Sequence, residues 1–177
     1  MEFLEKNKRK IALVVIDVQK KFRLEKLDET LFKKHIDIIN EATRLFRNAQ
    51  RPVIFVNYIG NSECHPYDGE DGDEYFDEIL TAETDIIVYK KHMNSFRESE
   101  LAQVVKATGC DNVLLAGTVT QYCVLATYFS AFDHGLVPYL LQGGCLSNDE
   151  AVNQAAELIC KTYDLAEVKE NLLQVRV

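Results

Sequence analysis

The segment IALVVID, residues 11–17, decides the fold class. It is a continuous run of aliphatic residues that ends in a carboxylate, and such a run is typical of a strand buried on both faces of a sheet. Four more runs of strand length follow it, at residues 52–58, 85–89, 112–119 and 137–141. Because strands buried on both faces occur mainly in parallel sheets covered by helices, the sequence predicts an α/β protein.

Helical patterns occupy the stretches between these runs. Apolar residues recur every three to four positions in residues 31–46 and 101–105. A later stripe of the same kind consists of Ala151, Ala155, Leu158 and Ile159. Alternating strands and helices at this spacing predict right-handed βαβ units, and therefore a three-layer α/β/α sandwich with a central, mostly parallel sheet. Residues 166–169 are the weakest strand candidate and would be the sixth strand.

The chain is long enough for one domain with a sizeable core. Its 177 residues are 47% hydrophobic and contain no internal repeat or linker, so we expect a single domain over residues 1–177. The regular pattern is interrupted at residues 60–77, where Asn, Gly, Asp and Glu dominate. This acidic loop is either a lid over a binding site or a solvated connection, and the sequence favours neither.

Composition excludes several classes of function. The 28 acidic and 20 basic side chains give a net charge of −8 without a basic stripe, which argues against a nucleic-acid partner. No apolar run approaches the ~20 residues of a membrane-spanning helix, and the N-terminus shows no signal-peptide pattern, so we expect a cytoplasmic protein without a membrane partner. The five cysteines include no C-x-x-C pair, which argues against disulfides and a thiolate zinc site.

Three chemically distinctive residues stand at the carboxyl ends of predicted strands, where ligands bind in open parallel sheets. Asp17 ends the first strand, Lys90 ends the third, and Cys123 follows the fourth. An unpaired buried carboxylate is costly, so Asp17 is either a capping or salt-bridged residue or the partner of Lys90. Because the fold gathers all three residues at one edge of the sheet, we expect a site in which the carboxylate moves the thiol proton and the ammonium stabilises the charges.

Cys123 is the expected nucleophile of this site. Thr120 is a good N-cap residue, which would place Cys123 in the first turn of the following helix. Free amide N–H groups and the helix dipole favour a thiolate there, and Lys90 would add to the effect, so we expect a lowered pKa for the thiol. A cysteine at this position can also be a packing residue. Packing is the role that we expect for Cys64, Cys110, Cys145 and Cys160.

These residues and their neighbours resemble the motifs of the isochorismatase-like cysteine hydrolases, the superfamily that includes nicotinamidases. The matching segments are Asp17-Val-Gln19 with Phe22, Tyr89-Lys90 with Asn94-Ser-Phe96 and Leu101, and Gly117-Thr-Val-Thr120 with Cys123-Val124. Three linked motifs in the family's order and spacing make the resemblance specific. It extends from residue 11 to about residue 149.

The resemblance implies a six-stranded parallel sheet and a catalytic triad of Asp17, Lys90 and Cys123. Cys123 would form a thioester-type acyl-enzyme, Asp17 would be the general base and acid, and Lys90 would orient and stabilise the charges. A cis peptide bond between Thr118 and Val119 would help to shape an oxyanion hole, with the backbone N–H groups of Val119 and Cys123 as donors. Because relatives are commonly oligomeric, we also expect a homo-oligomer.

The sequence departs from the family pattern at several positions. Nicotinamidases hold a metal with an Asp-x-His pair after the second strand and a further His, whereas this strand ends Asn57-Tyr-Ile-Gly and the nearby histidine is His65. We therefore predict no metal and no other cofactor, and we disfavour nicotinamide as substrate. Gln121 stands where many relatives carry Asp, which puts a nearby charge in doubt. The thiol of Cys123 argues against the isochorismate-cleaving branch, because vinyl-ether hydrolysis needs no nucleophile.

Two hypotheses of different class follow. The leading one is a metal-independent cysteine hydrolase that cleaves a small-molecule amide or related C–N bond, with Phe22 and Tyr122 lining the substrate pocket. The alternative is a non-catalytic or redox-sensing domain of the same fold that uses Cys123 as an oxidisable thiol. A dinucleotide-binding protein is disfavoured, because the turn after the first strand has no G-x-G-x-x-G motif.

Overall fold

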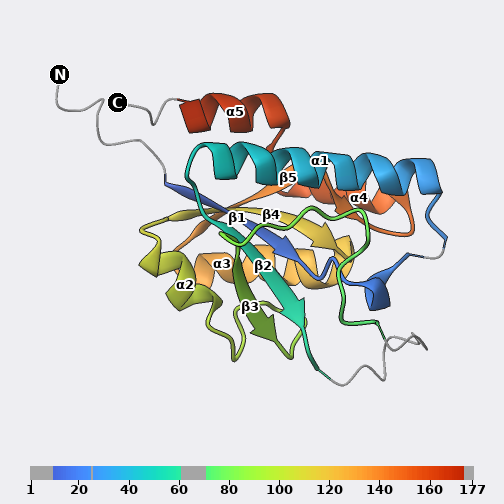
Figure 1. The fold of residues 1–177 in the computed structure, drawn as a ribbon, viewed down its shortest axis with the longest axis horizontal. Helices are drawn as coiled ribbons and strands as arrows, with labels where there is room; N and C mark the ends of the chain where they lie inside the picture. Colours follow the sequence, from blue (N-terminus) through green and yellow to red (C-terminus); the bar gives the residue numbers. More distant parts are fainter. Residues whose placement is uncertain (1–9, 25, 61–70, 174–177) are drawn as a thin grey trace.

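The computed structural model of the chain describes residues 10–24, 26–60 and 71–173. A six-stranded sheet stands at its centre, with helices on both faces (Figure 1). The strands are β1 (Ile11–Ile16), β2 (Val53–Tyr58), β3 (Ile86–Lys90), β4 (Asn112–Thr118), β5 (Val137–Leu146) and β6 (Thr162–Tyr163). The helices are α1 (Glu29–Asn48), α2 (Leu101–Ala107), α3 (Leu125–Asp133), α4 (Glu150–Ile159) and α5 (Leu165–Leu173), with short helical turns η2 (Lys20–Phe22) and η3 (Thr120–Val124).

The sheet is parallel throughout, with strand order β3-β2-β1-β4-β5-β6. From β1 the chain builds outward through β2 and β3, and it then returns to the other side of β1 to add β4, β5 and β6. The strand order therefore reverses between β1 and β4, which is where open parallel sheets form their binding crevice. The predicted α/β/α sandwich is confirmed.

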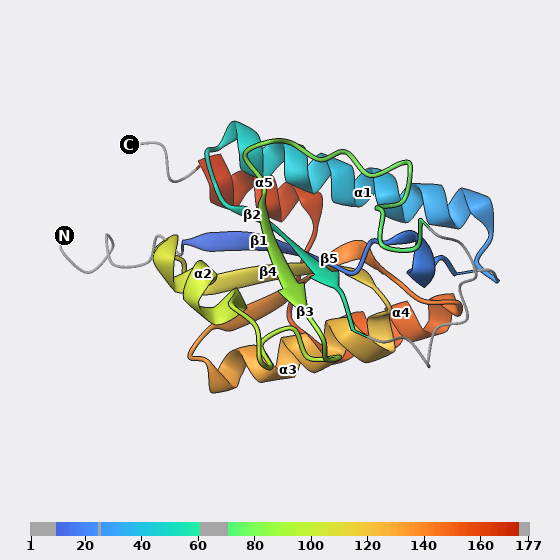
Figure 2. The same cartoon turned by 60° about the horizontal axis from the view of Figure 1, so that its bottom comes forward.

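Two hydrophobic cores lie on opposite faces of the sheet (Figure 2). Helices α1 and α5 cover one face, and α2, α3 and α4 cover the other. Strand β1 serves both cores, because Leu13 and Val15 point to the first and Val14 and Ile16 point to the second. This double burial explains why its sequence is continuously apolar. Among the described residues, no helix combines the length and apolar character needed to cross a membrane.

The sixth strand is not where the sequence predicted it. Residues 166–169 belong to α5, and β6 is a two-residue strand just before that helix. A reciprocal cap explains the error: the Glu167 N–H donates to Asp164 Oδ1 at 2.8 Å, and the Asp164 N–H donates to Glu167 Oε2 at 2.9 Å. This pair of bonds begins a helix, and Val168 then falls on its buried face.

The apolar stripe predicted for α4 is exposed rather than buried. Leu158 is 88% exposed and Ile159 is 69% exposed, and the two alanines of the stripe are also exposed. The buried residues of α4 are Asn153 and Ala156. The sequence therefore predicted the position of α4 along the chain correctly but not which side of the helix is buried. The buried side is the one on which Asn153 forms hydrogen bonds with Thr120 and Glu150.

Candidate active site

Asp17, Lys90 and Cys123 meet at the carboxyl ends of the strands. Asp17 follows β1, Lys90 is the last residue of β3, and Cys123 lies in η3 after β4. Their exposed fractions are 0%, 1% and 8%. Lys90 Nζ lies 2.6 Å from Asp17 Oδ2, and both charged groups act on the Cys123 thiol. The structure thus brings the three predicted residues together in a buried cluster.

Gly117 allows the ends of β1 and β4 to approach closely enough for this cluster. Its φ is +118°, and a Cβ atom at this position would lie 2.0 Å from the Ile16 carbonyl oxygen, so a larger residue does not fit. The residue that follows β1, Asp17, has a φ of +53° and donates its N–H to the Val56 carbonyl at 2.9 Å. This left-handed conformation, which Asp tolerates better than most residues, ends the strand at the carboxylate.

Lys90 is held by groups from three parts of the chain. Besides Asp17, it donates to the Met93 carbonyl at 3.1 Å, and its Nζ lies 5.9 Å from the centroid of the Tyr58 ring. The loop that carries Met93 is fixed to α3, because the Ser95 N–H donates to Thr127 Oγ1 at 3.0 Å. The ammonium group is therefore oriented without solvent contact.

Burial dominates the proton affinities of the cluster. Desolvation and, to a smaller extent, the negative charge of Asp17 raise the pKa of Cys123 to about 12, although Lys90 opposes both effects. Desolvation also raises the pKa of Asp17 above 3.8, against the opposing influence of Lys90. Our expectation of a lowered thiol pKa is wrong, because the thiol is too deeply buried for the helix terminus and one ammonium to compensate. The resting residue is a thiol.

The turn that carries Cys123 differs from the expected capped helix. The peptide bond between Thr118 and Val119 is cis, and η3 is a π-helical turn that runs into α3. The Val119 carbonyl accepts hydrogen bonds from the N–H groups of both Tyr122 and Val124, at 3.0 and 3.4 Å, so Cys123 stands between two anchored residues. Thr120 does not cap this turn, because its hydroxyl is engaged with another helix.

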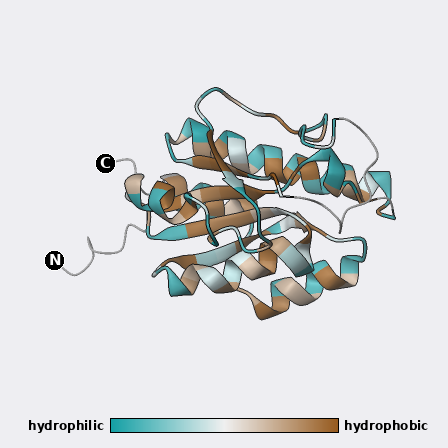
Figure 3. Cartoon of the chain, turned by 90° about the horizontal axis from the view of Figure 1, so that it is seen from below, coloured by the Kyte–Doolittle hydropathy of each residue, from teal (hydrophilic) through white to brown (hydrophobic). Residues whose placement is uncertain are grey.

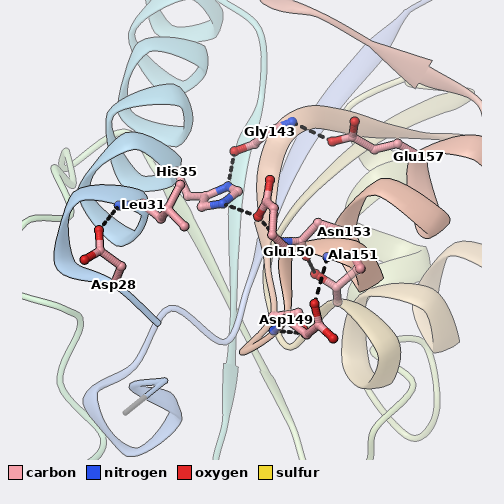
Figure 4. Close-up of polar contacts among 11 residues, drawn as sticks. Asp28, Leu31, His35, Gly143, Asp149, Glu150, Ala151, Asn153 and Glu157 are labelled. Carbon is pink, nitrogen blue, oxygen red and sulfur yellow. Dashed lines mark hydrogen bonds and ion pairs between the residues drawn. The ribbon is translucent and has the colours of Figure 1, made fainter. Parts of the chain in front are cut away.

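A chain of polar contacts leads from Thr120 to the opposite helical layer. Thr120 Oγ1 donates to Asn153 Oδ1 at 2.6 Å. Asn153 Nδ2 donates to Glu150 Oε2 at 2.9 Å (Figure 4). The same Glu150 oxygen lies 3.3 Å from His35 Nε2, and His35 Nδ1 lies 2.5 Å from the Gly143 carbonyl oxygen. None of these contacts was predicted from the sequence; the available signal was the i, i+3 spacing of two polar residues on α4.

The aromatic residues predicted for the pocket occupy different environments. Phe22 is buried, and its ring packs edge-on against Tyr58 at 5.8 Å, beside Lys90. Tyr122 is 52% exposed, on the outer side of η3. Gln19, part of the first motif, holds the end of β2: its Oε1 accepts from the Tyr58 N–H at 2.8 Å, and its Nε2 donates to the Tyr58 carbonyl at 3.3 Å.

The described part of the acidic loop, residues 71–77, is fastened to the segment after β1. Tyr75 forms an antiparallel bridge with Gln19, and the Lys20 N–H donates to the Glu74 carbonyl at 2.8 Å. Lys20 Nζ also pairs with three carboxylates, those of Asp71, Glu74 and Asp77, at 2.9, 3.0 and 3.1 Å. These hydrogen bonds raise the pKa of Lys20.

The remaining cysteines and histidines add no second cluster to the described part of the chain. Cys110, Cys145 and Cys160 are free thiols packed in the core beneath α2, α3 and α4, which confirms their predicted packing role. Cys64 and His65 lie outside the described residues. Over residues 10–24, 26–60 and 71–173, no group of three or more His, Cys, Asp or Glu residues is arranged to hold a metal ion.

Comparisons with known proteins identify a matching family and several similar proteins. The model of the isochorismatase domain matches residues 11–161. An uncharacterized isochorismatase family protein of Bacillus subtilis, YddQ, is 28% identical over 137 residues, which cover 76% of each chain. A cysteine hydrolase from Pseudomonas syringae pv. phaseolicola has the same fold, with a TM-score of 0.82, 18% identity, and coverage of 95% of this chain and 94% of that one. The N-carbamoylsarcosine amidase of Thermoplasma acidophilum has a TM-score of 0.73 at 23% identity, covering 88% of this chain and 95% of that one.

Proposed function

The chain belongs to the isochorismatase family of hydrolases, and from this premise we propose that it is a cysteine hydrolase that cleaves a small-molecule amide or related C–N bond. The observation that carries the proposal is the buried contact of Asp17, Lys90 and Cys123 at the point where the strand order reverses. The likeness to the fold of an N-carbamoylsarcosine amidase agrees with this reaction class.

The raised pKa values of Cys123 and Asp17 determine when the Cys123 thiol loses its proton. With a pKa of about 12, Cys123 holds almost no thiolate at neutral pH, so its proton leaves as the sulfur attacks. Asp17 is the acceptor, and its raised pKa makes it a stronger base than an ordinary carboxylate. Lys90 favours the ionised form of Asp17 against the effect of burial and stabilises the negative charge as it moves.

The reaction then proceeds in two balanced halves. The Cys123 sulfur forms a C–S bond to the carbonyl carbon while Asp17 takes the thiol proton, and the N–H groups of Val119 and Cys123 stabilise the oxyanion. When the tetrahedral intermediate collapses, the C–N bond breaks and Asp17 returns the proton to the departing amine. A water molecule, deprotonated by Asp17, attacks the thioester; the C–S bond breaks, the carboxylic acid is released and the thiol is restored.

The same features weigh against a redox sensor. Sensor cysteines are accessible and have a low pKa, because the thiolate is the species that peroxide oxidises. Cys123 is 8% exposed and its pKa is raised, so its environment suits a nucleophile that is deprotonated only within a complex. The hydrolase is therefore the better supported of the two functions.

Ammonia release from a panel of small primary amides and ureido compounds tests the proposal. We expect at least one compound to be hydrolysed, and Cys123→Ala to lower the rate by at least about 10³-fold. Cys110→Ala is the matched control, since it removes a buried thiol from the same core and should keep the activity. Full activity of Cys123→Ala would refute the nucleophile, and no turnover combined with reversible peroxide oxidation of Cys123 would favour the sensor.

A further inference from the structure

We propose that His35 is a positioning residue for the reaction, and that it acts through α4 on the turn that carries Cys123. His35 lies on the buried side of α1 and is 2% exposed. The strands between the two helical layers are largely hydrophobic (Figure 3), so a polar ring beside them needs hydrogen-bond partners. The inference rests on the proposed hydrolase function and assigns a role in the reaction to a residue outside the candidate site.

Both nitrogens of the His35 ring have a polar partner (Figure 4). Nδ1 lies 2.5 Å from the Gly143 carbonyl oxygen, which can only accept, so Nδ1 carries a proton. Nε2 lies 3.3 Å from Glu150 Oε2, and a proton must lie between these two atoms because two bare acceptors would repel each other. The ring therefore links β5 to α4.

The Gly143 end of this link is a fixed support. Gly143 lies where the register of the β4–β5 ladder shifts. Its φ is +70°, and a Cβ atom there would lie 2.7 Å from Ile38 Cδ1, so glycine allows α1 to approach the strand closely. The Gly143 N–H donates to Glu157 Oε1 at 2.8 Å, so side chains from α1 and α4 hold both backbone polar groups of this residue.

His35 holds the carboxylate of Glu150 inward. The Glu150 side chain is 38% exposed, so without a partner on its inner side it can turn to solvent. In the inward position, Oε2 also accepts from Asn153 Nδ2 at 2.9 Å, which directs the amide oxygen of Asn153 to Thr120. A reversed amide would set that oxygen against the carboxylate. The His35–Glu150 contact therefore determines how Asn153 is oriented.

Thr120 transmits this orientation to the turn of the reacting sulfur. Thr120 is the first residue of η3, and Cys123 follows three positions later in the same five-residue turn. Val119, which precedes the turn, offers no side-chain cap, so the 2.6 Å bond from Thr120 to Asn153 anchors its start. Since a displacement of about 1 Å can slow a reaction about 10²-fold, a loosened turn lowers kcat without weakening substrate binding.

Two amide variants of His35 separate its two contacts. His35→Gln places a donor near the position of Nε2 and keeps the bond to Glu150, whereas His35→Asn places one near Nδ1 and keeps the bond to Gly143. In ammonia release we expect kcat within about twofold of wild type for His35→Gln and about tenfold lower for His35→Asn, with KM unchanged in both. Equal kcat values, or a higher value for His35→Asn, would overturn the proposal.

Thr43→Val is the matched control for these variants. Thr43 is buried on the same helix, and its hydroxyl donates within α1, to the Asn40 carbonyl at 2.8 Å. The substitution therefore perturbs the core beneath α1 without touching the contacts of His35, and kcat should not change. Thermal unfolding by circular dichroism verifies that all variants remain folded.

Alkylation by iodoacetamide at one fixed pH, read by peptide mass spectrometry, tests the same step without turnover. We expect His35→Asn to label Cys123 several-fold faster, because a loosened turn uncovers a sulfur that is buried in the wild type, and to leave Cys110 and Cys145 at the wild-type rate. If no compound is hydrolysed but Cys123 alone is labelled faster, the proposed function fails and the control of the turn by His35 stands. Equal acceleration at all three cysteines, or unchanged labelling of Cys123, would overturn the inference.

Discussion

Helices α1 and α3, which cover opposite faces of the sheet, differ in how closely they follow the local rules of helix formation. Helix α1 is capped by Asp28, which accepts from two backbone N–H groups, and its outer side is laced with ion pairs such as Lys33–Asp37 and Arg44–Glu41. Helix α3 has no side-chain cap, begins in a π-helical turn and presents uncharged aromatic residues outward. Helix α1 obeys these local rules and contributes no residue to the candidate site, whereas α3 departs from them and directly follows the turn that carries Cys123.

The Asp17–Lys90 pair stands between the layers, so its loss should impair both stability and activity and should have the largest effect of any single substitution. Lys90→Met leaves a buried carboxylate without its counter-charge, and removing one partner of a buried pair costs about 3–5 kcal/mol. Activity should fall about 10³-fold as the ammonium is lost. Urea unfolding and ammonia release measure the two effects.

The double variant Asp17→Asn, Lys90→Met separates them. It removes both charges, so the unfolding free energy should recover most of its loss while the activity stays at background. If the single and double variants unfolded at the same urea concentration, the pair would not be coupled in the way that the 2.6 Å contact indicates.

Phe46→Ala removes a large side chain from the layer that contains α1. Phe46 is 1% exposed in the core beneath α1, and truncation of a buried Phe costs about 3–5 kcal/mol. The activity per folded molecule should not change, because no contact of the site involves this residue. A lower kcat of the folded fraction would contradict the prediction that the core beneath α1 affects stability and not the reaction.

The pH profile should reveal the candidate site without unfolding the protein. Asp17 acts as a base only when ionised, so activity should fall as the pH drops through its pKa, which burial raises above 3.8. The sign for stability is opposite: a carboxyl with a raised folded-state pKa contributes most stability below its unfolded pKa and loses it as the pH rises through the folded one. The kcat/KM profile should therefore show an acid limb where circular dichroism reports a folded protein, and coincident loss of both signals would contradict it.

The strands and the layer that contains α1 could be predicted from the pattern of buried residues. Parts of the layer that contains α4 could not, because they depend on contacts between residues far apart in the sequence. The strands and α1 were predicted because their buried sides are apolar in a regular period, and the parallel topology alone gathers Asp17, Lys90 and Cys123. The orientation of α4 was not predictable, because Asn153 turns inward to meet Thr120, 33 positions earlier in the chain. The raised thiol pKa depends on the depth of burial, which helix-terminus rules do not include.

Asn153→Ala tests the first contact of the chain that leads from Thr120 through α4 to His35 in the other layer, and it should have the smallest effect. It leaves the buried Thr120 hydroxyl without its acceptor, at a cost of about 1–3 kcal/mol, and frees the turn that precedes Cys123. Because the turn positions the reacting groups and not the bound substrate, kcat should fall roughly tenfold with KM unchanged. Gln154→Ala is the control, because Gln154 is the exposed neighbour of Asn153 on the same helix and does not take part in the Thr120–Asn153 hydrogen bond. Two results would contradict this prediction: Asn153→Ala lowers only the unfolding free energy, or both variants change kcat equally. Either result would mean that the chain of contacts from Thr120 to His35 stabilises the fold and does not affect the reaction.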